Sequence, residues 1–448
     1  MNSDWQTSTL GDLGPIKTGK TPPSSLGDGF GGTVPFVTPG DMAGQKWITD
    51  TDRYLNENGL TAVRSSLMPA RSVAVSCIGS DMGKAALLSR PSVTNQQINT
   101  VAVDESRFNA EFVYYDLSVR QQELKAAASG SATPILNKGH FSTFEISLPP
   151  RTTQDKIAEI LGRLDDKIEL NRRINQTLEA MAQAIFKSWF VDFDPVKAKI
   201  AALQEGRDPL RAAMSAISGK SDAELDALPP EQCEQLAATA ALFPDEMEES
   251  ELGEIPKGWA FKSIADIAEL AIGKVYVSSL HEDIYISTEN MLENRAGVTR
   301  AASLPSVANV PSFKAGQILI SNIRPYFKKI WMARFDGGRS PDVLAFEAKD
   351  PQWTNFLYNL MYQDSFFEFM TRTAKGAKMP RGDKDAIMGW NFPCDGGLLM
   401  AVFSERVRPH YVHIESLTAQ CNSLSELRDT LLPKLLSGEL SVSDIAVA

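Results

Sequence analysis

The chain has 448 residues, of which 43% are hydrophobic, and a formal net charge of −11. This length is too great for one ordinary core and predicts several domains. No apolar run reaches the roughly 18 residues that a membrane-spanning helix needs, and the first residues lack the basic start and apolar core of a secretory signal. The four cysteines lie far apart without a CxxC pair, so we expect a cytoplasmic protein and no zinc or iron–sulfur site.

Residues 14–21, GPIKTGKT, match the phosphate-loop pattern G-x-x-x-x-G-K-[ST] at every fixed position. A phosphate loop needs a helix that starts at its Lys-Thr end, because the helix N-terminus faces the phosphates. The segment PPSSLGDGFGG follows Thr21 instead, and its prolines and glycines disfavour a helix. Around this loop, residues 1–150 read mostly as short β-branched runs between turn residues, which predicts strands.

A heptad pattern then runs from Ile157 to Trp189. It predicts a helix over residues 153–190 that is roughly 55 Å long. We expect Thr152 or Thr153 to cap its start. At its end, Phe186, Trp189, Phe190 and Phe193 form an aromatic run that either contacts a partner protein or fills the chain's own core.

The negative charge is concentrated in one segment. Residues 201–255 hold 13 acids and three bases, and their net charge of −10 leaves −1 for the other 393 residues. Because this one segment accounts for most of the net charge, the negative net charge of the whole chain does not exclude nucleic-acid binding by other segments. The acidic segment is either a solvated connector or a surface that docks a protein partner.

The second half of the chain resembles the first in a conserved order of segments. The matches are WQTSTLGDLGPIKTGK (5–20) with WAFKSIADIAELAIGK (259–274), FVTPGDM (36–42) with YISTENM (285–291), VAVSCIGSDMGKAALL (73–88) with ILISNIRPYFKKIWMA (318–333), and SGSATP (129–134) with KGAKMP (375–380). Their order predicts an internal duplication. The second copy has Ala268 and Val275 where the first has Gly14 and Thr21, so the halves share a Gly-Lys turn and no nucleotide site.

A second heptad pattern, from Val407 to Leu435, lies 246 positions after Leu161 to Trp189. Pro409 within it implies either that the helix starts nearby or that it is kinked there. Such patterns favour packing of the two helices on each other, although each could instead pack on its own globular core. The expected seam consists of Leu161, Leu164, Ile168, Asn171, Asn175, Leu178, Ile185, Ile414, Leu417, Leu424, Leu431 and Leu435.

The remaining candidate catalytic motifs lack either a residue or the spacing that their chemistry requires. In PDVLAFEAK (341–349), Asp342 and Glu347 are five positions apart in an expected strand and point to opposite faces, so they cannot share a metal ion. His410 and His413 lie one helical turn apart without a third ligand nearby, so no metal site is predicted. NFPC (391–394) lacks the second proline of the amino-methyltransferase motif, and neither G-x-S-x-G nor H-E-x-x-H occurs. We therefore predict neither catalytic residues nor cofactors.

Several long strings resemble one family. ISLPPRTTQDKIAEILGRLDDKIELNRRINQTLEAMAQAIFKSWFVDFDPV (146–196) is similar to the central conserved region of type I restriction–modification specificity subunits. ELGEIPKGW (251–259), SFKAGQILISNIRPYFKKI (312–330) and LRDTLLPKLLSGEL (427–440) resemble further regions of the same family. The resemblance implies an α+β fold, with two duplicated α/β target-recognition domains separated by two long antiparallel coiled-coil helices. The expected parts are recognition domain 1 (1–150), central helix (151–198), acidic connector (199–255), recognition domain 2 (256–398) and C-terminal helix (399–448).

The resemblance also implies a non-catalytic subunit that reads a split, asymmetric double-stranded DNA site and recruits two adenine-methyltransferase subunits, to which restriction (translocase) subunits can be added. Phosphate contacts should come from lysines and arginines, and the candidates are Lys17, Lys20, Lys84, Lys138, Lys274, Arg324, Lys328, Lys329, Lys375, Lys378, Arg381 and Lys384. Candidate base readers, chosen for hydrogen-bonding side chains, are Ser80, Asn95, Gln96, Gln97, Asn137, Asn322, Tyr326 and Arg381.

Partner proteins are expected on the outward helix faces and on residues 186–193 and 431–440. Two alternative functions remain at this stage. One is a phosphate-loop ATPase built on GPIKTGKT, and the other is a coiled-coil scaffold that does not read DNA.

Overall fold

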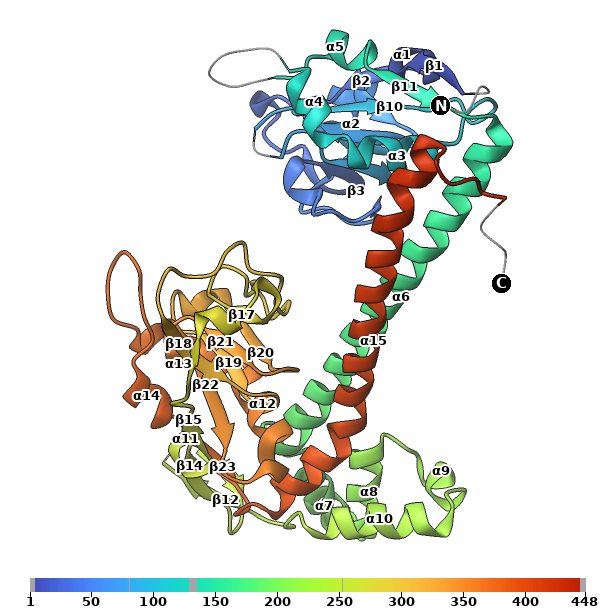
Figure 1. Ribbon diagram of the computed structural model, residues 1–448. Coiled ribbons are helices and arrows are strands. Elements are labelled where there is room, and N and C mark those ends of the chain that lie inside the picture. The colour runs from blue at the N-terminus through green and yellow to red at the C-terminus, as the bar shows by residue number, and fades with distance from the viewer. Residues whose placement is uncertain (1–4, 80, 129–134, 252, 444–448) are drawn as a thin grey trace. The chain divides into compact units, whose positions relative to one another are not determined.

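The computed structural model describes residues 5–79, 81–128, 135–251 and 253–443 (Figure 1). The chain forms two compact units. The first comprises Met1–Arg172 with Thr418–Ala448, and the second comprises Arg173–Leu417. The predicted Ser80 and the segment 129–134 lie outside the described residues.

The first unit contains two sheets and a short two-stranded ribbon. The five-stranded sheet has the order β2 (Ile16–Thr18), β10 (Ile98–Val101), β7 (Val73–Ser76), β8 (Ala85–Leu88), β4 (Trp47–Ile48). The four-stranded sheet has the order β5 (Tyr54–Leu55), β3 (Phe30–Val37), β9 (Ser92–Thr94), β6 (Leu67–Met68). The ribbon pairs β1 (Gln6–Thr9) with β11 (Glu145–Leu148), and the short helices are α1 (Leu10–Leu13), α2 (Glu57–Val63), α3 (Ala110–Val119), α4 (Gln121–Ala126) and α5 (Lys138–Ser142).

The second unit repeats this plan. One sheet has the order β15 (Ala268–Leu270), β22 (Val343–Ala348), β19 (Ile318–Ser321), β20 (Ile330–Met332), and the other has β16 (Lys274–Tyr276), β18 (Asn309–Phe313), β21 (Gly337–Arg339), β17 (Tyr285–Ile286). A ribbon pairs β14 (Ala260–Ser263) with β23 (Asn391–Cys394). The short helices are α11 (Ile264–Ile267), α12 (Thr354–Tyr362), α13 (Asp364–Thr373) and α14 (Lys384–Met388), and the hairpin β12 (Met247–Ser250) and β13 (Gly253–Pro256) leads into this domain.

The duplication extends to the register of the strands. In the first unit Ile98 lies opposite Ser76, and adding 245 to both numbers gives Val343 opposite Ser321 in the second. An isolated β-bridge formed by Ile78 in the first unit also has an equivalent 245 positions later, in the β-bridge formed by Ile323. At the start of each domain, a backbone N–H bonds a carboxylate three residues ahead, Thr9 to Asp12 (3.0 Å) and Ser263 to Asp266 (2.7 Å). The predicted fold class is therefore confirmed.

Two long helices, α6 (Arg151–Phe190) and α15 (Leu398–Ser437), contain 40 residues each. They are antiparallel, because α6 residues of increasing number meet α15 residues of decreasing number. Asp165 binds Arg428 (2.8 Å) in the first unit, and Glu179 accepts a hydrogen bond from Tyr411 (3.2 Å) in the second. Every residue of the expected seam is buried or partly buried.

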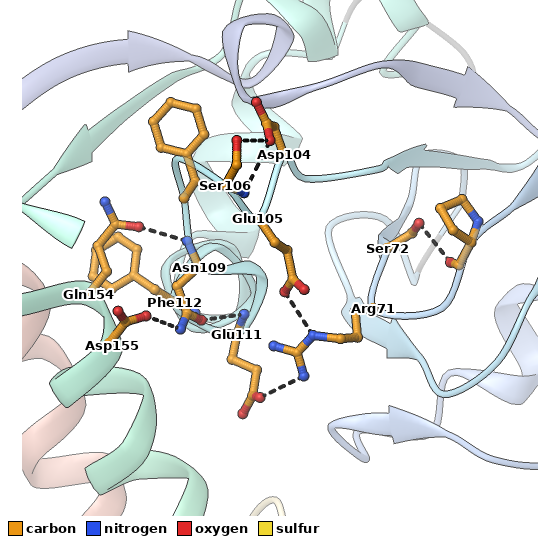
Figure 2. A network of polar contacts seen from close by, with 12 residues as sticks. Arg71, Ser72, Asp104, Glu105, Ser106, Asn109, Glu111, Phe112, Gln154 and Asp155 are labelled. Atoms are coloured by element: carbon orange, nitrogen blue, oxygen red, sulfur yellow. Dashed lines mark hydrogen bonds and ion pairs between the residues drawn. The ribbon is translucent and has the colours of Figure 1, made fainter. Parts of the chain in front are cut away.

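The ends of these helices differ from the sequence predictions. Helix α6 begins at Arg151, so Thr152 and Thr153 lie in its first turn and do not cap it. The Arg151 guanidinium donates to the carbonyl of Phe108 (2.9 Å) and to Asp155 (2.8 Å), which anchors this turn. Figure 2 shows Asp155 and its neighbour Gln154 bonded to Asn109, the cap of α3. Helix α15 begins at Leu398 and runs through Pro409, so of the two alternatives for this proline, the one in which the helix starts near it is wrong.

The acidic segment forms helices. Four of them follow Phe193, namely α7 (Asp194–Gln204), α8 (Pro209–Ser218), α9 (Asp222–Asp226) and α10 (Pro230–Ala241). The last three of these helices bury a small apolar cluster that includes Met214 and Leu225, and Arg211 bridges Asp222 and Asp226. The aromatic run is buried in the core of the second unit, with all four rings enclosed, namely Phe186, Trp189, Phe190 and Phe193. Of the two alternatives, the one in which these rings fill the chain's own core therefore applies.

Candidate nucleic-acid interface

The GPIKTGKT segment has no phosphate-binding geometry. After β2, the N–H of Gly19 donates to the carbonyl of Ile98 (3.1 Å) and that of Lys20 to Thr94 (2.9 Å). These donors are therefore occupied by the neighbouring backbone and cannot cradle a phosphate. The next helical turn is a three-residue 3-10 turn at Ser24–Leu26, so no helix starts at Lys20. This geometry gives no support to the ATPase alternative.

The other suspected motifs also resolve into ordinary contacts. Asp342 forms an ion pair with Arg381 (3.1 Å), whereas Glu347 accepts a hydrogen bond from Gln317 (2.8 Å). Within the described ranges, no group of three or more His, Cys, Asp or Glu side chains could hold a metal ion. Likewise, no helix in the described part of the chain is long and apolar enough to cross a membrane.

In the first unit, the turn between β7 and β8 (residues 77–84) carries little free charge. Lys84 pairs with Asp81 (2.7 Å), and Gly79 and Gly83 adopt positive φ angles of 81° and 85°. The nearby residues 95–97 form a second turn. Asn95 is 9% exposed and bonds Gln97 (3.2 Å), while the Thr21 hydroxyl donates to Gln96 (2.6 Å).

The remaining candidates of the first unit are separated. The Lys17 ammonium donates to the carbonyl of Leu67 (3.2 Å) and is half-buried. Lys20 is exposed beside Ser65 (3.5 Å). Asn137 caps α5 by accepting from the N–H of His140 (3.0 Å), so its carbonyl oxygen is occupied, and Lys138 next to it is exposed.

The equivalent turn of the second unit, between β19 and β20 (residues 322–329), is strongly basic. Adding 245 to Gly79 and Gly83 gives Arg324 and Lys328, which keep left-handed φ angles of 50° and 51°. A side chain in this conformation costs roughly 1–2 kcal/mol for each residue. Lys328 pairs with Asp364 (2.7 Å), and Lys329 donates to the carbonyl of Thr288 (2.9 Å).

The other base-reading candidates of this turn differ in access. Tyr326 is 47% exposed, so its ring and hydroxyl can reach a ligand. Asn322 is only 6% exposed, and its side-chain oxygen is buried and accepts no hydrogen bond from the residues that the structure describes. Asn322 therefore cannot read a base in this conformation.

A second basic segment, residues 375–384, lies against this turn. The N–H of Arg324 donates to the carbonyl of Pro380 (2.8 Å), and that of Gly382 donates to Asn322 (3.0 Å). Lys375 pairs with Asp383, whose pKa is lowered by this hydrogen bond. Lys378 and Lys384 are exposed, and within the described residues neither pairs with a carboxylate. The structure thus brings together seven of the predicted basic residues of this domain, while Lys274 is exposed on β16 of another sheet.

The sequence reading missed a third segment that supports this surface. Asn294 and Arg295 also have positive φ angles, and their N–H groups donate to the carbonyls of Phe327 (2.8 Å) and Lys328 (2.9 Å). The Arg295 guanidinium binds Asp364 (2.5 Å), and hydrogen bonds from Lys328 and then Arg295 lower the pKa of this carboxyl. Only the turn-like string ENRAG (293–297) marked this position in the sequence.

Comparisons with known proteins agree with these features. Residues 2–180 match the family model of the type I restriction modification DNA specificity domain. The chain is 34% identical over 336 residues to the type I restriction enzyme HindI specificity subunit of Haemophilus influenzae, covering 70% of this chain and 73% of that protein. It is 23% identical to the MjaIX specificity subunit of Methanocaldococcus jannaschii, covering 99% of this chain and 95% of that protein.

One solved structure supports the fold independently. The crystal structure of the type I restriction-modification S subunit from M. genitalium matches with a TM-score of 0.54 at 16% identity, covering 97% of this chain and 96% of that chain. The duplicated domains, the paired long helices and the matches in sequence lead to one conclusion: the chain belongs to the family of type I restriction enzyme specificity subunits.

Proposed function

We propose that each recognition domain of this specificity subunit reads one half of a split, asymmetric DNA site, with residues 1–150 reading one half and residues 256–398 the other. The observation that carries this proposal is the repeated strand register with different side chains in the equivalent turns. Two domains of one chain with different turn residues recognise different half-sites, so the site need not be palindromic.

DNA affinity should come mainly from exposed cations. Phosphate contacts explain most of the affinity of such proteins and its dependence on salt. In the second domain Lys378 and Lys384 are the best placed, because both are exposed and unpaired within the described residues. In the first domain the side chains of Lys20 and Lys138 are also exposed. The half-buried Lys17, bonded to a backbone carbonyl, supports this role least.

The long helices then set the gap between the half-sites and dock two adenine-methyltransferase subunits. Their buried seam leaves outward faces available for partners. Met181 on α6 and Leu427 on α15 are related by the 246-residue shift, and both are 47% exposed. Equivalent exposed apolar side chains are what two copies of one partner would require. Methyl transfer and any ATP-driven step belong to the partner subunits, and this chain supplies sequence recognition without catalysis.

The test is a binding titration of the complex formed with the methyltransferase subunits. Methylome sequencing of the host identifies the target site, and fluorescence anisotropy then measures affinity at several salt concentrations. Lys378→Gln combined with Lys384→Gln should weaken binding to all duplexes alike and lower the salt slope by about two, one for each lost phosphate contact. The control is Lys197→Gln, an exposed lysine on α7, which should change neither quantity.

Two results would contradict the proposal. Absence of any preferred sequence with the partners present would remove the DNA-reading role. An unchanged affinity and salt slope in the double variant would remove these lysines from the interface and favour the scaffold alternative.

A further inference from the structure

The turn at residues 322–329 concentrates unusual backbone conformations. Among the described residues, six non-glycine positions have a positive φ angle, and four of them lie here or on the segment bonded to it, namely Asn294, Arg295, Arg324 and Lys328. Left-handed residues other than glycine are unfavourable and persist where the surroundings fix them, often at functional sites. Either packing or function must therefore explain why these four residues keep a left-handed conformation.

The first unit shows that the backbone of the turn does not need these side chains. Gly79 and Gly83 hold the two left-handed positions there, with φ angles of 81° and 85°. Glycine adopts this conformation without steric cost. Arginine and lysine at the same positions of the second unit must therefore be explained by what their side chains contact.

Lys328 has a structural explanation. Its side chain is 29% exposed and pairs with Asp364, which also binds Arg295. This ion-pair group ties the turn to the start of α13, where Asp364 is the first residue. Packing therefore accounts for Lys328.

Arg324 has no such explanation. Its side chain is exposed, and in the described part of the chain it makes no hydrogen bond or ion pair, whereas its backbone is fixed on both sides. Its N–H donates to Pro380 (2.8 Å), and its carbonyl accepts from the N–H of Phe327 (3.0 Å). The adjacent residue, Ile323, bridges to Arg381. The result is an unpaired guanidinium on a rigid support.

We propose that Arg324 reads a guanine in the half-site recognised by the second domain. A guanidinium donates two parallel N–H bonds that match O6 and N7 of guanine in the major groove, and such contacts discriminate only when the donor is held in a fixed position. A contact between a lysine and a phosphate has no comparable geometric demand, and Lys378 and Lys384 can make such contacts. This proposal rests on the DNA-reading role proposed above and assigns one base contact within it.

The decisive variant is Arg324→Gly, in the complex with the methyltransferase subunits. Glycine suits the left-handed position, so the thermal unfolding temperature should not fall. Methylome sequencing should show that one guanine of one half-site is no longer required. In competition binding, the preference for guanine at that position, about tenfold to a hundredfold in the wild type, should disappear.

Two further variants separate base reading from other roles. Arg324→Lys keeps the charge and N–H donors for O6 and N7 of guanine but loses the planar fork of the guanidinium, so the guanine preference should become smaller without disappearing. Arg71→Gly is the matched control in the first unit. Arg71 is left-handed too (φ 64°), but its guanidinium binds Glu105 (2.7 Å) and Glu111 (3.1 Å), as Figure 2 shows. Arg71→Gly should lower stability and leave the recognised sequence unchanged.

Two outcomes would overturn the assignment. An unchanged motif with uniformly weaker binding and a salt slope lower by about one would make Arg324 a phosphate contact. An unchanged motif with unchanged binding in Arg324→Gly would exclude any role of Arg324 in DNA binding. A wild-type complex without any preferred sequence would instead refute the proposed function itself.

Discussion

The turns at residues 77–84 and 322–329 have the same place in the fold but differ in charge and in the side chains at their left-handed positions. Both connect antiparallel strands of equal register, and both contain two left-handed residues four positions apart. The first turn uses glycines and one lysine that is paired with Asp81. The second uses Arg324 and Lys328 at those positions and leaves Arg324 exposed.

This difference shows that the same backbone register can carry different charged side chains in the two domains. The sheet register fixes the turn, and the turn tolerates either glycine or a strained basic residue. The effect of a substitution in one half of the chain can therefore be compared with the effect of a substitution at the equivalent position of the other half.

The largest expected effect concerns the ends of the long helices. Trp189 on α6 and Leu435 on α15 are equivalent by the 246-residue shift and are 1% and 0% exposed. Trp189 packs edge-on against Phe243 with ring centroids 5.3 Å apart. Trp189→Ala should lower the free energy of unfolding by about 3–5 kcal/mol, and Leu435→Ala by about 2–5 kcal/mol, because each leaves a cavity in its unit.

Urea denaturation followed by circular dichroism measures both losses. Met181→Ala and Leu427→Ala are the matched controls on the same helices, since both side chains are 47% exposed. Their effects should stay within about 0.5 kcal/mol. If Trp189→Ala or Leu435→Ala behaved like its control, that helix end would not be part of its unit's core.

The second comparison concerns the Gly-Lys turns. A Cβ on Gly19 would lie 2.1 Å from the carbonyl oxygens of Thr94 and Asn95, which are backbone atoms that cannot move aside. A Cβ on Gly273 would meet only the Ser312 side chain, with its oxygen at 2.3 Å. Gly19→Ala should therefore be more destabilising than Gly273→Ala, by about 2 kcal/mol. Equal unfolding midpoints in thermal denaturation would show that the two turns are packed alike.

The smallest effect concerns the ion pairs that hold the basic turn. Hydrogen bonds from Lys328 and Arg295 place the pKa of Asp364 below its ordinary value in the folded state. Its stabilising contribution is therefore complete above the unfolded pKa of about 4 and is lost as the pH falls through the lower folded value. Because the Asp364 side chain is 62% exposed, the contribution should be about 0.2–1 kcal/mol.

Asp364→Asn should remove this part of the pH dependence of unfolding between pH 7 and pH 3. The measurement is the difference in unfolding free energy between these two pH values for the wild type and the variant. Identical differences would show that these ion pairs contribute nothing to stability.

The sequence was sufficient for features that depend on periodicity and repetition. The heptads predicted both long helices and their seam, and the aligned strings predicted the duplicated domains. Local rules failed where tertiary contacts dominate. Pro409 removes one hydrogen bond from α15, but the buried Phe403, Val407 and Tyr411 on either side maintain the helix. Similarly, Arg151 enters α6 because its guanidinium is bound to Phe108 and Asp155.

The candidate interface was only partly accessible to sequence reasoning. The basic residues of segments 324–329 and 375–384 could be picked out by their charge, but their ion pairs could not. The left-handed conformation of Arg324 had only one signal in the sequence, its alignment with Gly79, because arginine itself rarely adopts this conformation. The buried state of Asn322 was also hidden, since polar residues near a turn are usually exposed.

The division of the first unit between two distant chain segments has a consequence for the order of synthesis. Its core includes Leu432 and Leu435 together with residues such as Leu10 and Phe112. The second unit is contiguous, from Arg173 to Leu417, and can bury its own core as soon as it leaves the ribosome. The domain that is translated first is therefore completed last, and until α15 arrives its apolar face is a site that chaperones can protect.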